Sequence, residues 1–177
     1  MCKRMDSALE KKMEGAITTL VTTFSRSGKN DKPVIMHSIR VGIKLFNYGY
    51  DADVVISGIL HDILEDTDYG FDKLEHEYCE VVTEIVKACS FDEKIIDRVE
   101  RNTDMFKRCK QNGRNALLVK CADLIENMPF ISLVDEKNIE LKQVLATKYA
   151  EFFRFADEIK SEPIFQEYTD IFHRYFM

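Results

Sequence analysis

The segment LHDILEDT, at positions 60–67, concentrates the residues best suited to chemistry. If it is helical, Asp62, Glu65 and Asp66 share a face, with His61 at its edge, because residues three and four apart are neighbours on a helix. The residues just before it are strongly apolar, which predicts partial burial. Carboxylates clustered beside a core repel one another and lose hydration, and a divalent cation bound by histidine and carboxylates removes that cost. The alternative is a solvent-facing acidic helix end.

Two residues elsewhere in the chain are candidates to complete a metal centre. His37 lies early in an expected helix, near the apolar stripe of Val41 and Leu45, and therefore faces inward on one side. A lone histidine on such a face is otherwise a hydrogen-bonded core residue. Asp123 lies in the middle of an apolar helical segment, where a carboxylate needs either a cation or a hydrogen-bond donor. For Asp123 the alternative is a local ion pair with Lys120, three residues earlier.

The elements that must position these residues are expected to be helices. Apolar residues recur at helical spacing nearly throughout, and no segment alternates clearly enough to predict a strand. We expect helices at about 7–23, 34–47, 51–61, 72–89, 92–110, 113–128, 137–160 and 162–175, with a polar loop at 25–33 and a turn at 67–70. A chain of 177 residues is long enough for one packed core and short for two. The predicted fold class is all-α, a single-domain helical bundle over residues 1–177.

The composition narrows the class of function. Hydrophobic residues make up 45% and charged residues 32% of the chain, and the apolar runs are far too short to cross a membrane. The first residues lack the apolar region of a signal peptide, so a soluble, cytoplasmic protein without a membrane partner is expected. The net charge of −6 argues against nonspecific nucleic-acid binding, which depends on Lys and Arg at phosphates. A small phosphorylated substrate remains compatible with it, provided that a metal or local cations lie in the site. The sequence does not indicate an oligomeric state.

Three motifs in order resemble a known family. His37, the pair His61-Asp62, and Asp123 follow an H…HD…D pattern. HDILEDT at 61–67 resembles HDxxEDT, KCADLIENM at 120–128 resembles K-L-A-D-R-L-x-N-M, and Arg26 followed by PVIMH at 33–37 resembles an arginine loop leading to P-Y-I-x-H-P. The chain thus resembles the HD-domain phosphohydrolases. Within them it is most similar to the hydrolase domains of RelA/SpoT-type guanosine polyphosphate 3′-pyrophosphohydrolases, including small alarmone hydrolases. The resemblance covers about residues 16–156.

This resemblance implies an all-helical HD-type fold and a role for each matching residue. It implies one divalent metal ion, most often Mn²⁺, bound by His37, His61, Asp62 and Asp123. Glu65 and Asp66 would form the catalytic acidic pair, whose separate roles the sequence does not distinguish. The residues implied to contact substrate are Arg26, Lys29, Asn127 and Tyr149. The implied reaction is hydrolysis of a phosphoanhydride or phosphoester by a metal-activated water, here removal of the 3′-pyrophosphate of guanosine 3′,5′-bispyrophosphate (ppGpp).

The chain departs from the family pattern where a nucleotide would be held. Ser27 stands where a second basic residue is expected, and Lys29 in the same loop is the candidate to replace it. Val34, Ser38 and Leu124 replace a tyrosine, a proline and a basic residue, respectively. A second hypothesis therefore keeps the metal chemistry but changes the substrate to another nucleotide or phosphoester. A third, of a different class, is a non-catalytic binding module that holds the metal for stability or sensing.

Overall fold

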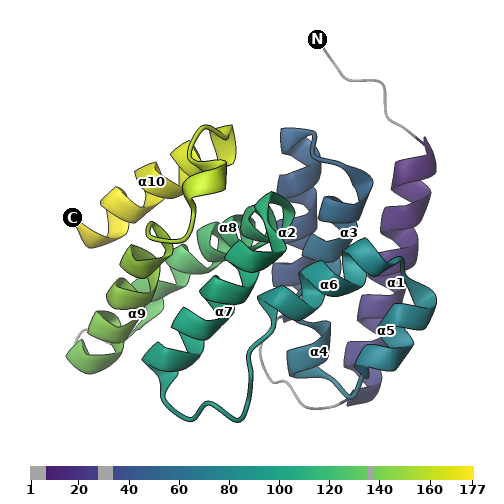
Figure 1. The fold of residues 1–177 in the computed structure, drawn as a ribbon, viewed down its shortest axis with the longest axis horizontal. Coiled ribbons are helices and arrows are strands. Elements are labelled where there is room, and N and C mark those ends of the chain that lie inside the picture. The colour runs from purple at the N-terminus through teal and green to yellow at the C-terminus, as the bar shows by residue number, and fades with distance from the viewer. Residues whose placement is uncertain (1–6, 28–33, 135–137) are drawn as a thin grey trace.

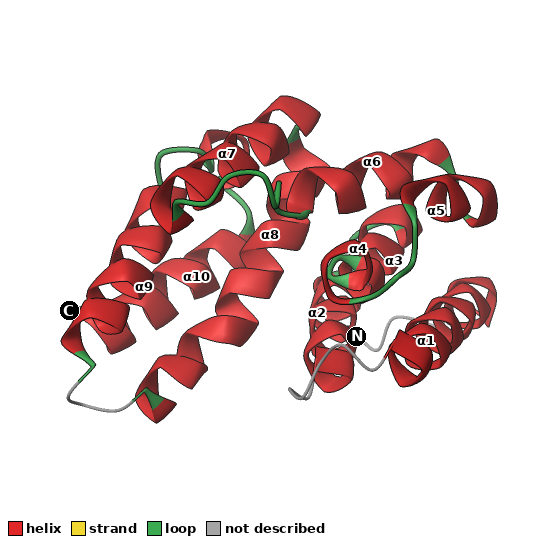
Figure 2. Ribbon diagram, turned by 90° about the horizontal axis from the view of Figure 1, so that it is seen from below, coloured by secondary structure: helices red, strands yellow, loops and turns green. Residues whose placement is uncertain are grey.

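The computed structural model describes residues 7–27, 34–134 and 138–177, and within these ranges it contains helices and no strand. In chain order the elements are α1 (Ser7–Ser27), α2 (Val34–Tyr48), α3 (Ala52–Leu60), α4 (Ile63–Asp66), α5 (Phe71–Glu77), α6 (Glu80–Cys89), α7 (Arg98–Asn112), α8 (Arg114–Asn127), the 3₁₀ helix η1 (Met128–Leu133), α9 (Ile139–Phe152), the 3₁₀ helix η2 (Asp157–Ile159) and α10 (Pro163–Phe176) (Figures 1 and 2). The predicted all-α fold class is confirmed. Across these same ranges, no helix combines the length and apolar character needed to cross a bilayer.

Helix α8 lies at the centre of the fold. Every residue from 116 to 125 is buried, as expected for a helix that is apolar on nearly all sides. It packs against α2, α3 and α6 on one side and against α7 and α10 on the other (Figure 1). A carboxylate on this helix is therefore held inside the protein, where several elements meet.

Two glycines allow α2 and α3 to pack closely against each other. A Cβ atom at Gly42 would lie 2.3 Å from Ile59 Cγ1, and one at Gly58 would lie 2.4 Å from Leu45 Cδ1. Only a residue without a side chain fits at such distances. The close packing brings a histidine of α2 beside the histidine that follows α3, and their ring centroids are 5.2 Å apart.

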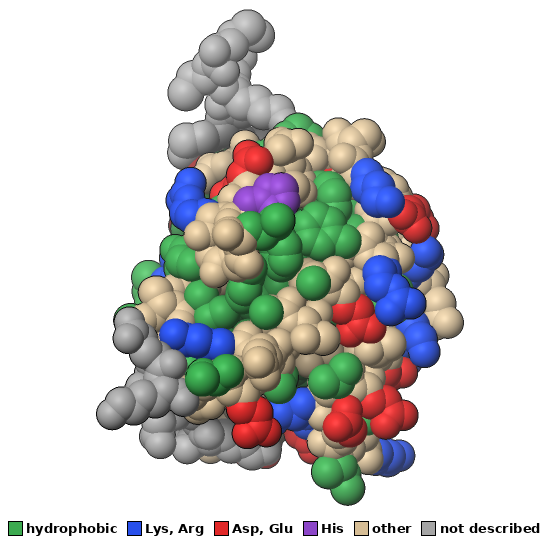
Figure 3. Space-filling model, turned by 90° about the vertical axis from the view of Figure 1, so that its left-hand side faces the viewer, with side chains coloured by type: hydrophobic (Ala, Val, Ile, Leu, Met, Phe, Trp, Pro, Cys, Tyr) green, Lys and Arg blue, Asp and Glu red, His purple; other side chains and the backbone are tan. Residues whose placement is uncertain are grey.

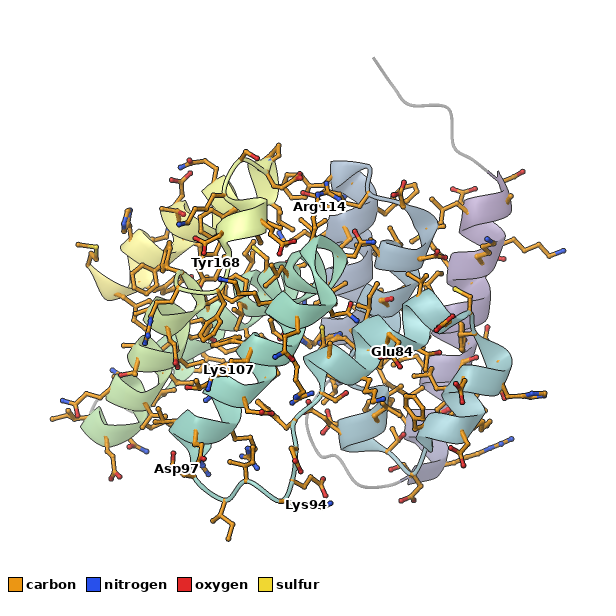
Figure 4. All side chains as sticks on the ribbon, in the orientation of Figure 1. Glu84, Lys94, Asp97, Lys107, Arg114 and Tyr168 are labelled. Carbon is orange, nitrogen blue, oxygen red and sulfur yellow. The ribbon has the colours of Figure 1, made fainter. Side chains whose placement is uncertain are left out.

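The aromatic residues near the C-terminus mainly extend the core. Phe165 and Tyr168 on α10 are buried, and Tyr168 is labelled in Figure 4. The Tyr168 hydroxyl donates a hydrogen bond of 2.6 Å to the backbone oxygen of Tyr149 on α9. Phe172 and Phe176 are partly buried against the same core. Apolar side chains also reach the surface on the side of the molecule shown in Figure 3.

Several predicted helix boundaries are wrong, and each error marks a place where tertiary packing bends the chain. The helix expected at 72–89 is divided by extended backbone at Tyr78 and Cys79, and the Tyr78 hydroxyl donates a hydrogen bond to Thr19 on α1. The helix expected at 137–160 ends at Phe152, and the chain then turns to bury Ala156.

The first helix and the expected helix at 92–110 also differ from prediction. Helix α1 continues to Ser27, so Arg26 is helical and does not belong to a loop. Helix α7 begins only at Arg98, where the Asp97 side chain accepts a hydrogen bond from the backbone of Glu100. The charged residues before it form an irregular segment that crosses the surface.

Candidate metal centre and adjoining cavity

The four residues predicted as metal ligands meet at one point from three parts of the chain. His37 is on α2, Asp123 is on α8, and His61 and Asp62 connect α3 to α4. His37 Nε2 lies 3.1 Å from Asp123 Oδ1 and 3.7 Å from Asp62 Oδ2. His61 Nε2 lies 3.1 Å from Asp62 Oδ1 and 3.5 Å from Asp123 Oδ1. One ligand atom from each of His37, His61 and Asp123 lies within 4.8 Å of the others, a spacing that allows them to surround a single ion.

A break between α3 and α4 creates this arrangement, so the condition that positions 60–67 form one helix is not met. Helix α3 ends at Leu60 and α4 begins at Ile63, while Asp62 has φ −96° and ψ −1°, outside regular helix geometry. Asp62 and the acids of α4 therefore do not share one helix face. They nevertheless line one cavity.

The His61 ring has the hydrogen bonding of a metal ligand. Its Nδ1 donates to the backbone oxygen of Gly58 at 2.8 Å, which directs Nε2 toward two carboxylates. His61 Nε2 and His37 Nδ1 are buried and have no hydrogen-bond partner among the described residues. Burial disfavours a charged imidazole, but the charges of Asp62 and Asp123 outweigh that effect and raise the pKa of His61 well above its usual value. A positive charge is thus favoured at Nε2, and either a proton or a metal ion can supply it.

Asp123 is a buried carboxylate that several donors hold in its ionised form. Lys120 Nζ lies 2.9 Å from Oδ2, and Asn127 Nδ2 donates to Oδ1 at 2.5 Å. Burial alone would raise the pKa of Asp123, but Lys120, His37 and His61 together hold it well below its usual value. Both interpretations of Asp123 from the sequence describe real contacts, since it pairs with Lys120 through one oxygen and meets the histidines through the other.

A cavity of about 450 Å³ adjoins the centre, within the size range of small-molecule sites. Its described lining consists of Val34, His37, Asp62, Glu65, Asp66, Phe91, Lys120, Asp123, Asn127, Phe130 and Lys148. Three of the four candidate ligands, all except the fully buried His61, therefore face the same space as the predicted acidic pair.

Glu65 is suited to exchanging a proton near neutral pH. Its Oε1 accepts a hydrogen bond of 2.7 Å from the backbone N–H of Phe91. Burial, followed by the negative charge of Asp62, raises the pKa of Glu65 from 4.5 to about 7. A carboxyl group with such a pKa can act as a general base or a general acid. Asp66 lies beside it on α4, and its backbone oxygen accepts a hydrogen bond of 3.4 Å from Ser27.

The residues predicted to contact substrate are distributed differently. Asn127 lines the cavity. Arg26 is exposed and lines a separate groove of about 340 Å³ that also includes Asp68 and Tyr69. Tyr149 is buried, packs against the ring of Phe176 and is not part of the cavity lining. Lys29 lies outside the described residues.

Three residues of the cavity gave no usable signal in the sequence. Phe91 lies between α6 and α7, Phe130 lies on η1 and is 43% exposed, and Lys148 lies on α9. The Lys148 Nζ atom lies 5.8 Å from the centroid of the Phe91 ring and 6.0 Å from that of Tyr149. Their positions depend on how distant helices pack, which local spacing does not report.

Comparison with known proteins gives one family for most of the chain. The family model described as "HD domain" matches residues 16–155. The zebrafish (Danio rerio) guanosine-3′,5′-bis(diphosphate) 3′-pyrophosphohydrolase MESH1 is 29% identical over 129 residues, which are 72% of this chain and 68% of that protein. The guanosine-3′,5′-bis(diphosphate) 3′-pyrophosphohydrolase of Aquifex aeolicus is 28% identical over 102 residues, 56% of this chain. The matched region spans only 15% of the Aquifex protein, so this chain is similar to a small part of it.

Solved structures show the same fold. The structure described as "A metazoan ortholog of SpoT hydrolyzes ppGpp and plays a role in starvation responses" matches with a TM-score of 0.70 and 19% identity, over 92% of this chain and 94% of that one. The protein lmo0812 from Listeria monocytogenes matches with a TM-score of 0.66 and 18% identity, over 84% of this chain and 100% of that one. At these identities the structural likeness establishes the arrangement of helices.

Proposed function

The chain belongs to the HD domain family, and on that premise we propose that it is a metal-dependent phosphohydrolase that converts ppGpp and water into GDP and pyrophosphate. The observation that carries the proposal is the meeting of two histidines and two aspartates beside a cavity that the acidic pair also lines. The substrate is proposed from the relatives, because MESH1 and the Aquifex protein are both named as 3′-pyrophosphohydrolases of this compound.

One divalent cation would be held by His37, His61, Asp62 and Asp123, and we propose Mn²⁺. Imidazole and carboxylate together suit such first-row metals. The fit is supported by the buried His61 Nε2, which faces two carboxylates without a hydrogen-bond partner. When bound, the cation supplies Lewis acidity and lowers the pKa of water.

Glu65 and Asp66 would carry the two proton transfers of the reaction. Glu65, with its pKa near 7, accepts a proton from the attacking water while the Phe91 N–H holds one of its oxygens in place. Asp66 borders the same cavity and is proposed to protonate the oxygen of the leaving group. Together they provide one acid and one base within a single turn of α4.

Asn127 is proposed to contact the nucleotide, since it borders the cavity as well as holding Asp123. Arg26, Lys29 and Tyr149 stay predictions from the family pattern. For Arg26, contact with substrate requires that a bound nucleotide extend beyond the cavity toward the groove beside α1.

The test is pyrophosphate release by purified protein loaded with Mn²⁺, with ppGpp measured beside a panel of ordinary nucleotides. We expect release from ppGpp that is lost when EDTA removes the metal and restored when Mn²⁺ is added back. Asp66→Asn should abolish turnover and leave the metal bound. Metal-loaded protein that releases no pyrophosphate from ppGpp would refute this substrate.

A second candidate function, hydrolysis of another nucleotide or phosphoester, is favoured by two departures from the family pattern. Leu124 is fully buried in the core, so its position contributes nothing to the cavity, and Val34 places an apolar side chain in the cavity wall. Turnover of another panel member with ppGpp left intact would support this function. Metal that stabilises the fold without any turnover would instead support a binding module.

A further inference from the structure

Lys148 is a cation on the cavity wall that has no acidic partner among the described residues. It lines the cavity from α9, and its Nζ makes no ion pair or hydrogen bond with any described residue. Lys120, the other lysine of the described lining, already forms an ion pair, because its Nζ lies 2.9 Å from Asp123 Oδ2. Lys148 is thus the lysine on this wall that remains available to a ligand.

Two aromatic rings surround the Lys148 ammonium group in place of a carboxylate. The rings of Phe91 and Tyr149 lie 5.8 and 6.0 Å from Nζ, at the limit of a cation–π contact. The guanidinium of Arg101 lies 5.0 Å from the Phe91 ring centroid, so this ring has two cations near it. Such contacts place the ammonium group without neutralising it.

Burial makes this arrangement costly for the folded protein. It lowers the pKa of Lys148 from its usual value, and the acids of the metal centre only partly offset the effect. A part-buried charge without a partner destabilises a fold, and a ligand that brings an anion removes the penalty. An anionic group of a substrate, bound to Lys148, would therefore remove this cost.

The charges of the cavity point to the same ligand chemistry. Its described lining includes the four acids Asp62, Glu65, Asp66 and Asp123, against the cations Lys120 and Lys148. A substrate with several phosphate groups entering such a space needs positive charge at more than one point. A cation at the candidate metal centre would supply positive charge at one of these points, and Lys148 would supply it at another.

We propose that Lys148 binds a phosphate group of the nucleotide substrate and thereby sets the preference for polyphosphorylated nucleotides. This inference rests on the proposed function, because it assumes that the cavity receives a phosphorylated nucleotide. Lysine binds phosphate as a point charge with three donors, so an anionic oxygen in contact with Nζ would complete the ion pair that the protein leaves open.

The test measures binding of GDP and of guanosine to Mn²⁺-loaded protein by isothermal titration calorimetry. Lys148→Met removes the charge and keeps a similar length of side chain, while Lys148→Arg keeps the charge. The matched control is Lys142→Met, since Lys142 is on the same helix but borders a different groove, with Ile131 and Ile139. Metal content and thermal unfolding are measured for every variant to verify folding.

We expect Lys148→Met to weaken GDP binding by about 10- to 100-fold, as for loss of a charged hydrogen bond, with guanosine binding unchanged. The GDP affinity of Lys148→Arg should stay within about 5-fold of that of the native protein, since the variant keeps the charge. The GDP affinity of Lys142→Met should equal that of the native protein. In turnover, Lys148→Met should raise KM for ppGpp more than it lowers kcat. Folded Lys148→Met with native GDP affinity, or a native protein that does not bind GDP, would overturn the proposal.

The two proposals fail in different ways. If native protein does not hydrolyse ppGpp but GDP binding still depends on Lys148, the substrate of the reaction is wrong and the phosphate contact stands. If ppGpp is hydrolysed and neither GDP affinity nor KM depends on Lys148, the reaction stands and the role of Lys148 is wrong.

Discussion

Two part-buried lysines, Lys44 and Lys148, show opposite treatments of charge in one fold. Lys44 on α2 lies 2.8 Å from Glu167 on α10 and 3.2 Å from Glu126 on α8. Burial disfavours its charge, but the two acids outweigh that effect and raise its pKa. Lys148 has no acid within ion-pair distance among the described residues, and burial lowers its pKa.

The difference separates a charged group that holds helices together from one that is available to a ligand. The cluster around Lys44 closes on itself, since Arg40 pairs with Glu126 at 3.0 Å and Tyr48 donates to Glu167 at 2.7 Å. The polar groups of the cavity are less completely paired. Histidine nitrogens there lack a hydrogen-bond partner among the described residues, and burial disfavours the charged forms of Glu65 and Lys148. Incomplete compensation in a folded protein is typical of functional sites.

The largest effect is expected from the metal centre. His61→Ala should lose the bound metal and reduce turnover more than about 1,000-fold, because it removes the ring nitrogen that faces Asp62 and Asp123. Glu126→Gln is the matched control from the Lys44 cluster and should keep both metal and turnover. Metal content by mass spectrometry, together with pyrophosphate release, measures the contrast. Native turnover by metal-free His61→Ala would show that the centre is structural.

A smaller loss of activity is expected at Glu65. Glu65→Gln keeps the oxygen that accepts the Phe91 N–H but cannot accept a proton, so turnover should fall by about 100- to 10,000-fold with metal content unchanged. The rate is measured with saturating Mn²⁺. If Glu65→Gln retained native kcat, proton transfer would have to be assigned to another group.

Much of the site could be predicted because its residues lie in short local motifs. The all-α class follows from helical spacing of apolar residues, and Asp123 stands out as a carboxylate inside an apolar helix. The position of His37 beside His61 is not visible in local spacing, since it depends on the close packing at Gly42 and Gly58.

Other features depend on tertiary structure alone. The break at His61 and Asp62 occurs in a segment whose residue types all permit a continuous helix. The segment contains no glycine or proline that would predict the break. Lys148 lies in an ordinary helix, and the packing of α9 against α7 and α10 determines its position at the cavity. The polar neighbours of Arg26 predict a loop, but α1 continues through this residue.

The two lysines should also differ in stability measurements. Lys44→Met leaves Glu167 without its cation and should lower the free energy of unfolding by about 3 kcal/mol, as for a broken buried ion pair. Lys148→Met removes an uncompensated charge and should leave stability unchanged or raise it. Urea unfolding of both variants without metal gives the comparison. A loss in Lys148→Met as large as that in Lys44→Met would mean that Lys148 also has a structural partner.

The last expected effect is a pH-dependent cost at Glu65 in the metal-free protein. Because folding raises the pKa of Glu65 from 4.5 to about 7, the folded state binds this proton more tightly than the unfolded chain. Its contribution to stability is fully present below the unfolded pKa and is lost as the pH rises through the folded pKa. Glu65→Gln should therefore match the native protein within about 0.5 kcal/mol at pH 4.5 and be more stable by about 3 kcal/mol at pH 8. Urea unfolding in EDTA at both pH values measures this difference, in which other titrating groups cancel. If the native protein and Glu65→Gln were equally stable at pH 8, the charged form of Glu65 would carry no energetic cost. Its surroundings would then stabilise its charge as fully as the two acids stabilise the charge of Lys44.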